Sequence, residues 1–83
     1  PNTFDAHRLI WLAAKEGVQP AVKEALMSAY FEKGIDLSQK ENLVQVAASA
    51  GLNRTKALAL LNSKEGMEEV RQAQQRNYQR KIS

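Results

Sequence analysis

Apolar residues recur at helical spacing along most of the chain, and no stretch alternates between apolar and polar positions as a strand does. Glycine commonly ends a helix and proline favours a first helical turn, so Gly17, Pro20, Gly34 and Gly51 divide this pattern into separate helices. We predict five: Asn2 or Thr3 to Gly17, near Pro20 to Gly34, Ser38 to Gly51, Asn53 to Leu61, and Ser63 through Tyr78. The expected fold class is all-α, a compact bundle forming a single helical domain over residues 1–83.

The same spacing predicts which side of each helix is buried. The expected apolar stripes are Phe4, His7, Trp11 and Ala14 with Ile10 beside them; Val22, Leu26, Ala29, Tyr30 and Phe31; Leu43, Val46, Ala47 and Ala50; and Met67, Val70, Ala73 or Gln74, and Tyr78. His7 is expected to be a hydrogen-bonded packing residue on this stripe. Arg8 falls outside the stripe, and we expect it to be exposed.

Residues suited to helix starts support these boundaries. Ser38 and Glu41 have the spacing of a capping box, which is the strongest local signal in the chain. Asn2 and Asp5 resemble a second capping box, and Asn53 and Ser63 are expected to cap the fourth and fifth helices. Gly66 is then expected in the first turn of the fifth helix.

The composition narrows the possible chemistry. The 83 residues include no cysteine, so the chain can form no disulfide and offers no thiol. A single histidine with scattered carboxylates does not make a metal-ligand set, and we expect neither a metal nor a cofactor. The longest unbroken apolar run, residues 9–14, is too short to span a bilayer. This chain alone is therefore not expected to be a catalyst.

The net charge of +3 is unevenly distributed. Arg71, Arg76, Arg80 and Lys81 lie in the last thirteen residues, where there is no acid, while the rest of the chain sums to −1. Cations near a helix C-terminus are favourable, so this segment indicates a solvated helix face; a nucleic-acid contact is the alternative.

The opening segment carries the most specific pattern. Asn2-Thr3-x-x-Ala6-His7-Arg8, together with the Ile82-Ser83 end and the five-helix pattern between them, resembles the helical insertion of a DsbA-like thioredoxin-fold oxidoreductase of the FrnE-like branch. Segments 25–37, 43–57 and Val70 are similar to the middle and last helices of that insertion. Both ends then resemble cut points, and we expect the chain to be a fragment of a larger bacterial protein.

This resemblance implies a function for the parent protein. In the family, a Cys-x-x-Cys outside the helical block exchanges disulfides with substrate, and the helical domain covers that site and shapes substrate access. Asn2, Thr3, His7 and Arg8 would line the active site. The implied partners are the thioredoxin-fold domain of the same parent chain and a protein or small thiol substrate, in a cytoplasmic protein without a membrane partner. The 2-hydroxychromene-2-carboxylate isomerases and kappa-class glutathione transferases share this architecture and are alternative parents.

Local structure gives the opening segment a second interpretation. Asn2 would simply cap the first helix, Asp5 would favour its N-terminus, and His7 would pack.

A different functional class is also consistent with the pattern. Ala47, Gly51 and Leu52 have the spacing of a helix-turn-helix, in which Arg54, Thr55 and Lys56 would begin a DNA-recognition helix. The rest of that helix is apolar, so nucleic acid is the less favoured partner.

Apolar residues can also exceed what a small core covers. Six large residues are candidates for an exposed apolar surface, and if so the isolated domain would self-associate; they are Phe4, Ile10, Trp11, Leu12, Phe31 and Met67.

Overall fold

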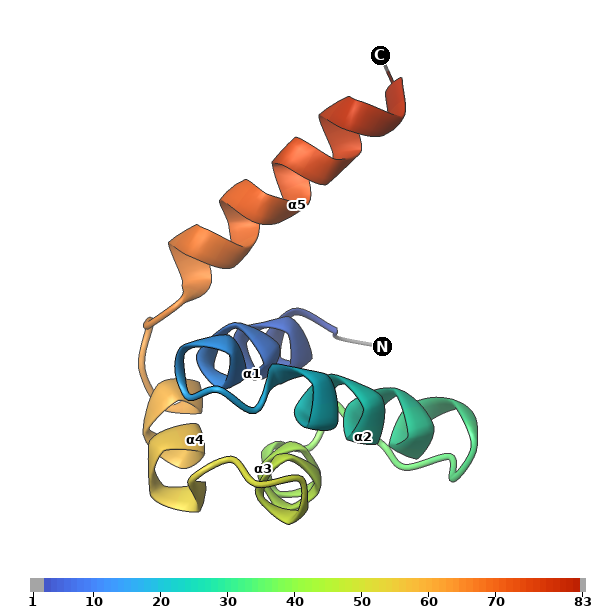
Figure 1. The fold of residues 1–83 in the computed structure, drawn as a ribbon, viewed down its shortest axis with the longest axis vertical. Helices are drawn as coiled ribbons and strands as arrows, with labels where there is room; N and C mark the ends of the chain where they lie inside the picture. Colours follow the sequence, from blue (N-terminus) through green and yellow to red (C-terminus); the bar gives the residue numbers. More distant parts are fainter. Residues whose placement is uncertain (1–2, 83) are drawn as a thin grey trace.

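The computed structural model describes residues 3–82, with side chains described for residues 3–76. Its five helices are α1 (Phe4–Lys15), α2 (Gln19–Phe31), α3 (Lys40–Ser49), α4 (Arg54–Leu61) and α5 (Met67–Ile82). No strand occurs within these described residues. The predicted all-α fold is confirmed. Figure 1 shows α1 to α4 gathered at one end of the molecule, with α5 running away from them along the long axis.

The hydrophobic core is shared by α1 to α4. Leu9, Val22 and Ala47 are completely buried, which places the packed sides of α1, α2 and α3 against one another. Leu60 of α4 closes the core with 1% exposure. Burying each of the leucine and valine side chains contributes roughly 1.5–3 kcal/mol, so this core is a main source of the fold's stability.

The core-facing side of α1 differs from the predicted stripe. Ala6, Leu9 and Ala13 face the core, whereas His7 and Ala14 are exposed. Phe4 and Trp11 are half-buried on another side of α1, next to α5: Trp11 lies against Gly66, and Arg71 stacks over the Phe4 ring at 5.7 Å. A single apolar stripe is the wrong description because α1 has neighbours on more than one side.

The predicted exposure of Arg8 is also wrong. Its side chain is 1% exposed, although it carries a permanent charge. Nη2 donates to the carbonyl oxygens of Leu60, Ser63 and Glu65 at 2.6, 2.7 and 2.9 Å, and Nε donates to the Glu65 carbonyl at 3.1 Å. Nη1 donates to Asp5 Oδ1 at 3.1 Å. Burial is tolerated because each guanidinium nitrogen has an acceptor.

Two of the predicted caps are wrong, and one is confirmed. Asn53 Oδ1 accepts from the Lys56 amide at 2.9 Å, as expected for the start of α4. Ser38 does not cap α3, because the Asp36 carboxylate accepts both its amide and its hydroxyl, at 3.0 and 2.6 Å. The helix therefore begins later, with Gln39 as its N-cap residue.

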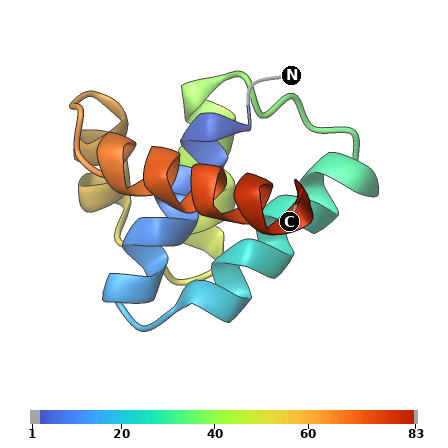
Figure 2. The ribbon, with the colours of Figure 1, turned by 90° about the horizontal axis from the view of Figure 1, so that it is seen from above.

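Ser63 does not cap α5 either, because its hydroxyl donates to Leu60 and accepts from the Glu65 amide. Gly66 precedes α5 instead of lying in its first turn, with φ at +78°. A Cβ atom at Gly66 would lie 2.8 Å from Cε3 of Trp11, so the backbone passes directly against this ring. Seen from above in Figure 2, α5 starts over α4 and crosses over α1. Gly66 and Val70 are buried, while most described side chains of α5 are exposed; Tyr78, Arg80 and Lys81 lie outside the described side chains.

Candidate functional site

An apolar groove lies between the first turns of α1 and the outer side of α2. Its volume is about 250 Å³. Ala6, Ile10 and Leu26 form apolar parts of its lining, and Leu37 reaches it from the α2–α3 connection. The complete lining is Thr3, Ala6, His7, Ile10, Lys23, Leu26, Met27, Tyr30, Phe31 and Leu37. No carboxylate is present among these residues, so the groove suits an apolar group.

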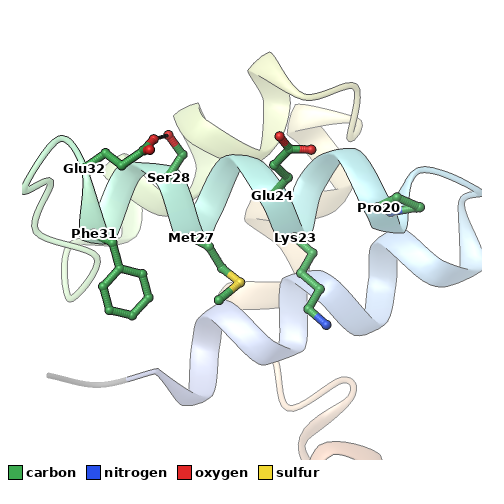
Figure 3. A pocket seen from close by; sticks show the side chains of 7 residues that line it. All are labelled: Pro20, Lys23, Glu24, Met27, Ser28, Phe31 and Glu32. Atoms are coloured by element: carbon green, nitrogen blue, oxygen red, sulfur yellow. Dashed lines mark hydrogen bonds between the residues drawn. The ribbon is translucent and has the colours of Figure 1, made fainter.

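The α2 side of the groove exposes unusually large apolar side chains. Met27 is 49% exposed and Phe31 is 71% exposed, and the Phe31 ring meets the Tyr30 ring edge-on at 4.9 Å. Figure 3 shows Lys23, Met27 and Phe31 projecting from α2 toward the α1 side. Exposed apolar side chains grouped in this way are typical of a surface that contacts another molecule or domain.

The opposite edge of α2 has a different character. Glu24, Ser28 and Glu32 project away from α1 in Figure 3, and the Ser28 hydroxyl donates to Glu32 Oε1 at 2.6 Å. They border a broader, more open depression of about 500 Å³, which also reaches Met27 and Phe31. The exposed face of α2 is thus apolar toward α1 and acidic on its far edge.

His7 and Thr3 form the polar rim of the groove. His7 Nδ1 lies 2.8 Å from the Thr3 carbonyl oxygen. Since a carbonyl can only accept, Nδ1 carries the proton of this bond, and Nε2 is the ring nitrogen that can interact with a ligand. The bond fixes the imidazole at the start of α1, although Thr3 makes no side-chain cap bond there.

The predicted site residues are not all brought together. Thr3 and His7 share the groove, whereas the Arg8 guanidinium is directed toward Leu60, Ser63 and Glu65 at the far side of α1. Asn2 lies outside the described residues.

Lys23 and Met27 line the groove but were not among the site residues predicted from the sequence. The spacing of Lys23, Met27 and Phe31 at every fourth residue places them on one side of α2, and this signal could have found them.

The residues of the DNA-binding alternative lie on the first turn of α4. Arg54, Thr55 and Lys56 are exposed, and Lys56 Nζ is paired with Glu16 Oε1 at 2.8 Å. Ala47, Leu52 and Ala57 are buried between α3 and α4, which is the packing that any close helix pair requires.

The carboxyl group of Asp36 has a displaced pKa. The Ser38 hydroxyl and amide both donate to Asp36, and these hydrogen bonds hold the pKa of Asp36 below its ordinary value. Asp36 lies in the α2–α3 connection, outside the groove. Within the described residues, no cluster of metal-ligating side chains occurs and no helix could cross a membrane.

Comparison with known proteins relates the chain to a protein family. The family model described as a DSBA-like thioredoxin domain matches residues 1–83. No curated protein and no solved structure matches the chain.

Proposed function

This chain belongs to the family of DSBA-like thioredoxin domains, and from that membership we propose that it is the helical insertion of a FrnE-like thiol–disulfide oxidoreductase. In this proposal the chain covers the active site of the parent protein and shapes substrate access. It is not catalytic by itself.

The sequence and the fold both support a chain that covers the active site but does not itself carry out disulfide exchange. Disulfide exchange needs a thiolate, and none of the 83 residues is a cysteine. A thioredoxin-type site also needs a strand-supported helix N-terminus, and residues 3–82 contain only helices and their connections. The reactive cysteine pair therefore comes from the thioredoxin-fold part of the parent chain, which is the partner that we propose for this domain.

The observation that carries the proposal is the apolar groove with His7 and Thr3 at its rim. Thr3 and His7 belong to the motif that resembles the family, and both are exposed at the start of α1. The groove beside them exposes Met27 and Phe31. An apolar surface next to a fixed imidazole can hold the substrate while its thiol or disulfide reacts elsewhere. We propose that Thr3 and His7 line the entrance, and that Arg8 supports the helix carrying them.

The experiment is performed on the DSBA-like protein that contains this segment. Met27→Ala with Phe31→Ala should lower kcat/KM for oxidation of a reduced protein substrate by about tenfold, because two apolar contacts of roughly 0.7 kcal/mol each are lost. His7→Ala should lower it separately. The thiol pKa and reduction potential should remain unchanged in the Met27 and Phe31 variant, because these two side chains are uncharged and donate no hydrogen bond to a thiolate.

Leu58→Ala is the matched control, since Leu58 is also large, apolar and 45% exposed but lies on α4. This variant should retain full activity. An equal loss in Leu58→Ala and in the groove variants, or unchanged kcat/KM in all of them, would refute the role of the groove. Glutathione conjugation or isomerisation in place of disulfide exchange would instead assign the parent to the transferase or isomerase branch.

A further inference from the structure

The joint between α4 and α5 is built around one buried side chain from a distant part of the sequence. Arg8 of α1 donates to Leu60 in the last turn of α4 and to Ser63 and Glu65 in the connection that follows. Because α4 ends at Leu61, the Leu60 carbonyl has no amide donor further along the helix, and it accepts instead from Arg8 and from the Ser63 amide and hydroxyl. The guanidinium therefore caps the C-terminus of α4 and holds the connection in place.

A second contact fixes the other end of the same joint. Gly66 immediately precedes α5 and lies against the Trp11 ring, which is one helical turn from Arg8 on the same side of α1. Val70, in the first turns of α5, is 6% exposed and is the next buried residue after Gly66. From Glu65 to Val70 the start of α5 is thus held from α1 by hydrogen bonds and by an aromatic surface.

We propose that Arg8 is a positioning residue that fixes the direction of α5 relative to α1 and α2. Without it, the Ser63 and Glu65 carbonyls lose the donor that ties the connection to α1, the Lys40–Asn62 hydrogen bond holds only the start of the connection, and α5 turns about Gly66. This role stands independently of the function proposed above, because it depends only on contacts within the chain.

Arginine suits this position better than lysine. Its planar group donates from three nitrogens at fixed angles, which lets one side chain reach the Glu65, Leu60 and Ser63 carbonyls together with Asp5. A lysine ammonium is a single point and cannot span these acceptors. Lysine at position 8 should therefore preserve the charge but not the direction of α5.

The test is a distance measurement between α2 and α5 in the 83-residue chain. Because the sequence has no cysteine, Glu24→Cys and Gln75→Cys introduce the only thiols for two spin labels, both at exposed positions. Gln75 lies about 13 Å along the helix from Gly66, so a turn of about 20° at the joint moves it by about 5 Å. We expect a narrow distance distribution with Arg8, and a mean shifted by about that amount or a doubled width in Arg8→Met.

Two further variants separate this role from general destabilisation. Gly66→Ala damages the same joint from its other side and should also shift or broaden the distribution. Leu43→Ala weakens the core on α3 and should lower the urea midpoint while leaving the distance unchanged. All are measured well below the unfolding midpoint, with helix content checked by circular dichroism.

The outcomes are decisive. If Arg8→Met does not fold, Arg8→Lys and Gly66→Ala still test the joint. An unchanged distribution in every folded Arg8 variant, or an equal shift in Leu43→Ala, overturns the proposal.

Discussion

The Trp11 ring lies so close to Gly66 that a Cβ atom on the glycine would approach Cε3 to 2.8 Å. Gly66→Ala should therefore destabilise in two ways. A left-handed backbone costs an alanine about 1–2 kcal/mol, and displacing the ring adds roughly 1–3 kcal/mol. Urea unfolding measures the sum, and the fluorescence of Trp11, the one tryptophan in the sequence, should change in the folded state.

Gly34→Ala is the control for this variant. Gly34 also has a positive φ, +64°, but a Cβ atom there would meet nothing within 4 Å. It should lose only the backbone contribution of about 1–2 kcal/mol and leave the emission unchanged. Equal losses at the two glycines would show that the Trp11 contact contributes nothing.

The two partners in the Arg8–Asp5 ion pair should differ strongly on substitution. Arg8→Met leaves the Ser63 and Glu65 carbonyl oxygens without their donor and should cost roughly 3–5 kcal/mol in the free energy of unfolding. Asp5→Asn retains an oxygen acceptor at a partly exposed position, 24% for the side chain, and should cost less than about 1 kcal/mol. Chemical denaturation of both variants checks the difference; similar costs would indicate that the charge pair, and not the carbonyl contacts, dominates.

The N-cap residues of α4 and α1 differ, because only the first makes a side-chain hydrogen bond to its helix. Asn53 accepts the Lys56 amide, so Asn53→Ala should lower stability by about 1 kcal/mol. Thr3 is the N-cap residue of α1 without a side-chain cap bond, and Thr3→Ala should remain within about 0.5 kcal/mol of the original chain. Thermal unfolding followed by circular dichroism can rank the two; a larger loss at Thr3 contradicts this assignment.

The Asp36–Ser38 hydrogen bonds should produce a pH-dependent contribution to stability. Because the folded-state pKa of Asp36 is lowered, the contribution is fully present above the unfolded-state pKa and disappears as the pH falls through the folded-state pKa. Ser38→Ala should raise the pKa of Asp36 toward its ordinary value. The difference in unfolding free energy between the original chain and Ser38→Ala should then be present at neutral pH and vanish in strong acid.

An NMR titration of the Asp36 carboxyl carbon measures this pKa directly. Ser49→Ala is the control, because its hydroxyl donates to the Val46 carbonyl and not to a carboxylate. A pKa of Asp36 that is unchanged in Ser38→Ala would reject the proposed cause.

The helices could be predicted from the sequence because their determinants are local. Gly17, Gly34 and Gly51 all have positive φ where the pattern ends a helix, and Asn53 caps as expected. The error at Ser38 arose from a competing local acceptor, the Asp36 carboxylate two residues earlier.

Burial was less predictable because it depends on which helices become neighbours. Arg8 was expected in solvent, and its carbonyl acceptors lie 52 to 57 residues away, so no local pattern indicates them. In the groove, His7 and Thr3 follow from the motif, while Met27 becomes significant only when α2 lies beside α1. The family followed from the Asn-Thr-x-x-Ala-His-Arg start, and the family match confirms the resemblance at that level.

The acceptors that Arg8 reaches in the α4–α5 connection are all main-chain carbonyls. Every residue type supplies such an oxygen, so the side chains of Lys64 and Glu65 can change without altering the geometry that Arg8 recognises. Among homologous sequences, the constraint should therefore appear at position 8 alone, and covariation between Arg8 and this connection should be absent. A contact prediction built on correlated substitutions would then overlook the interaction that joins α1 to the α4–α5 connection.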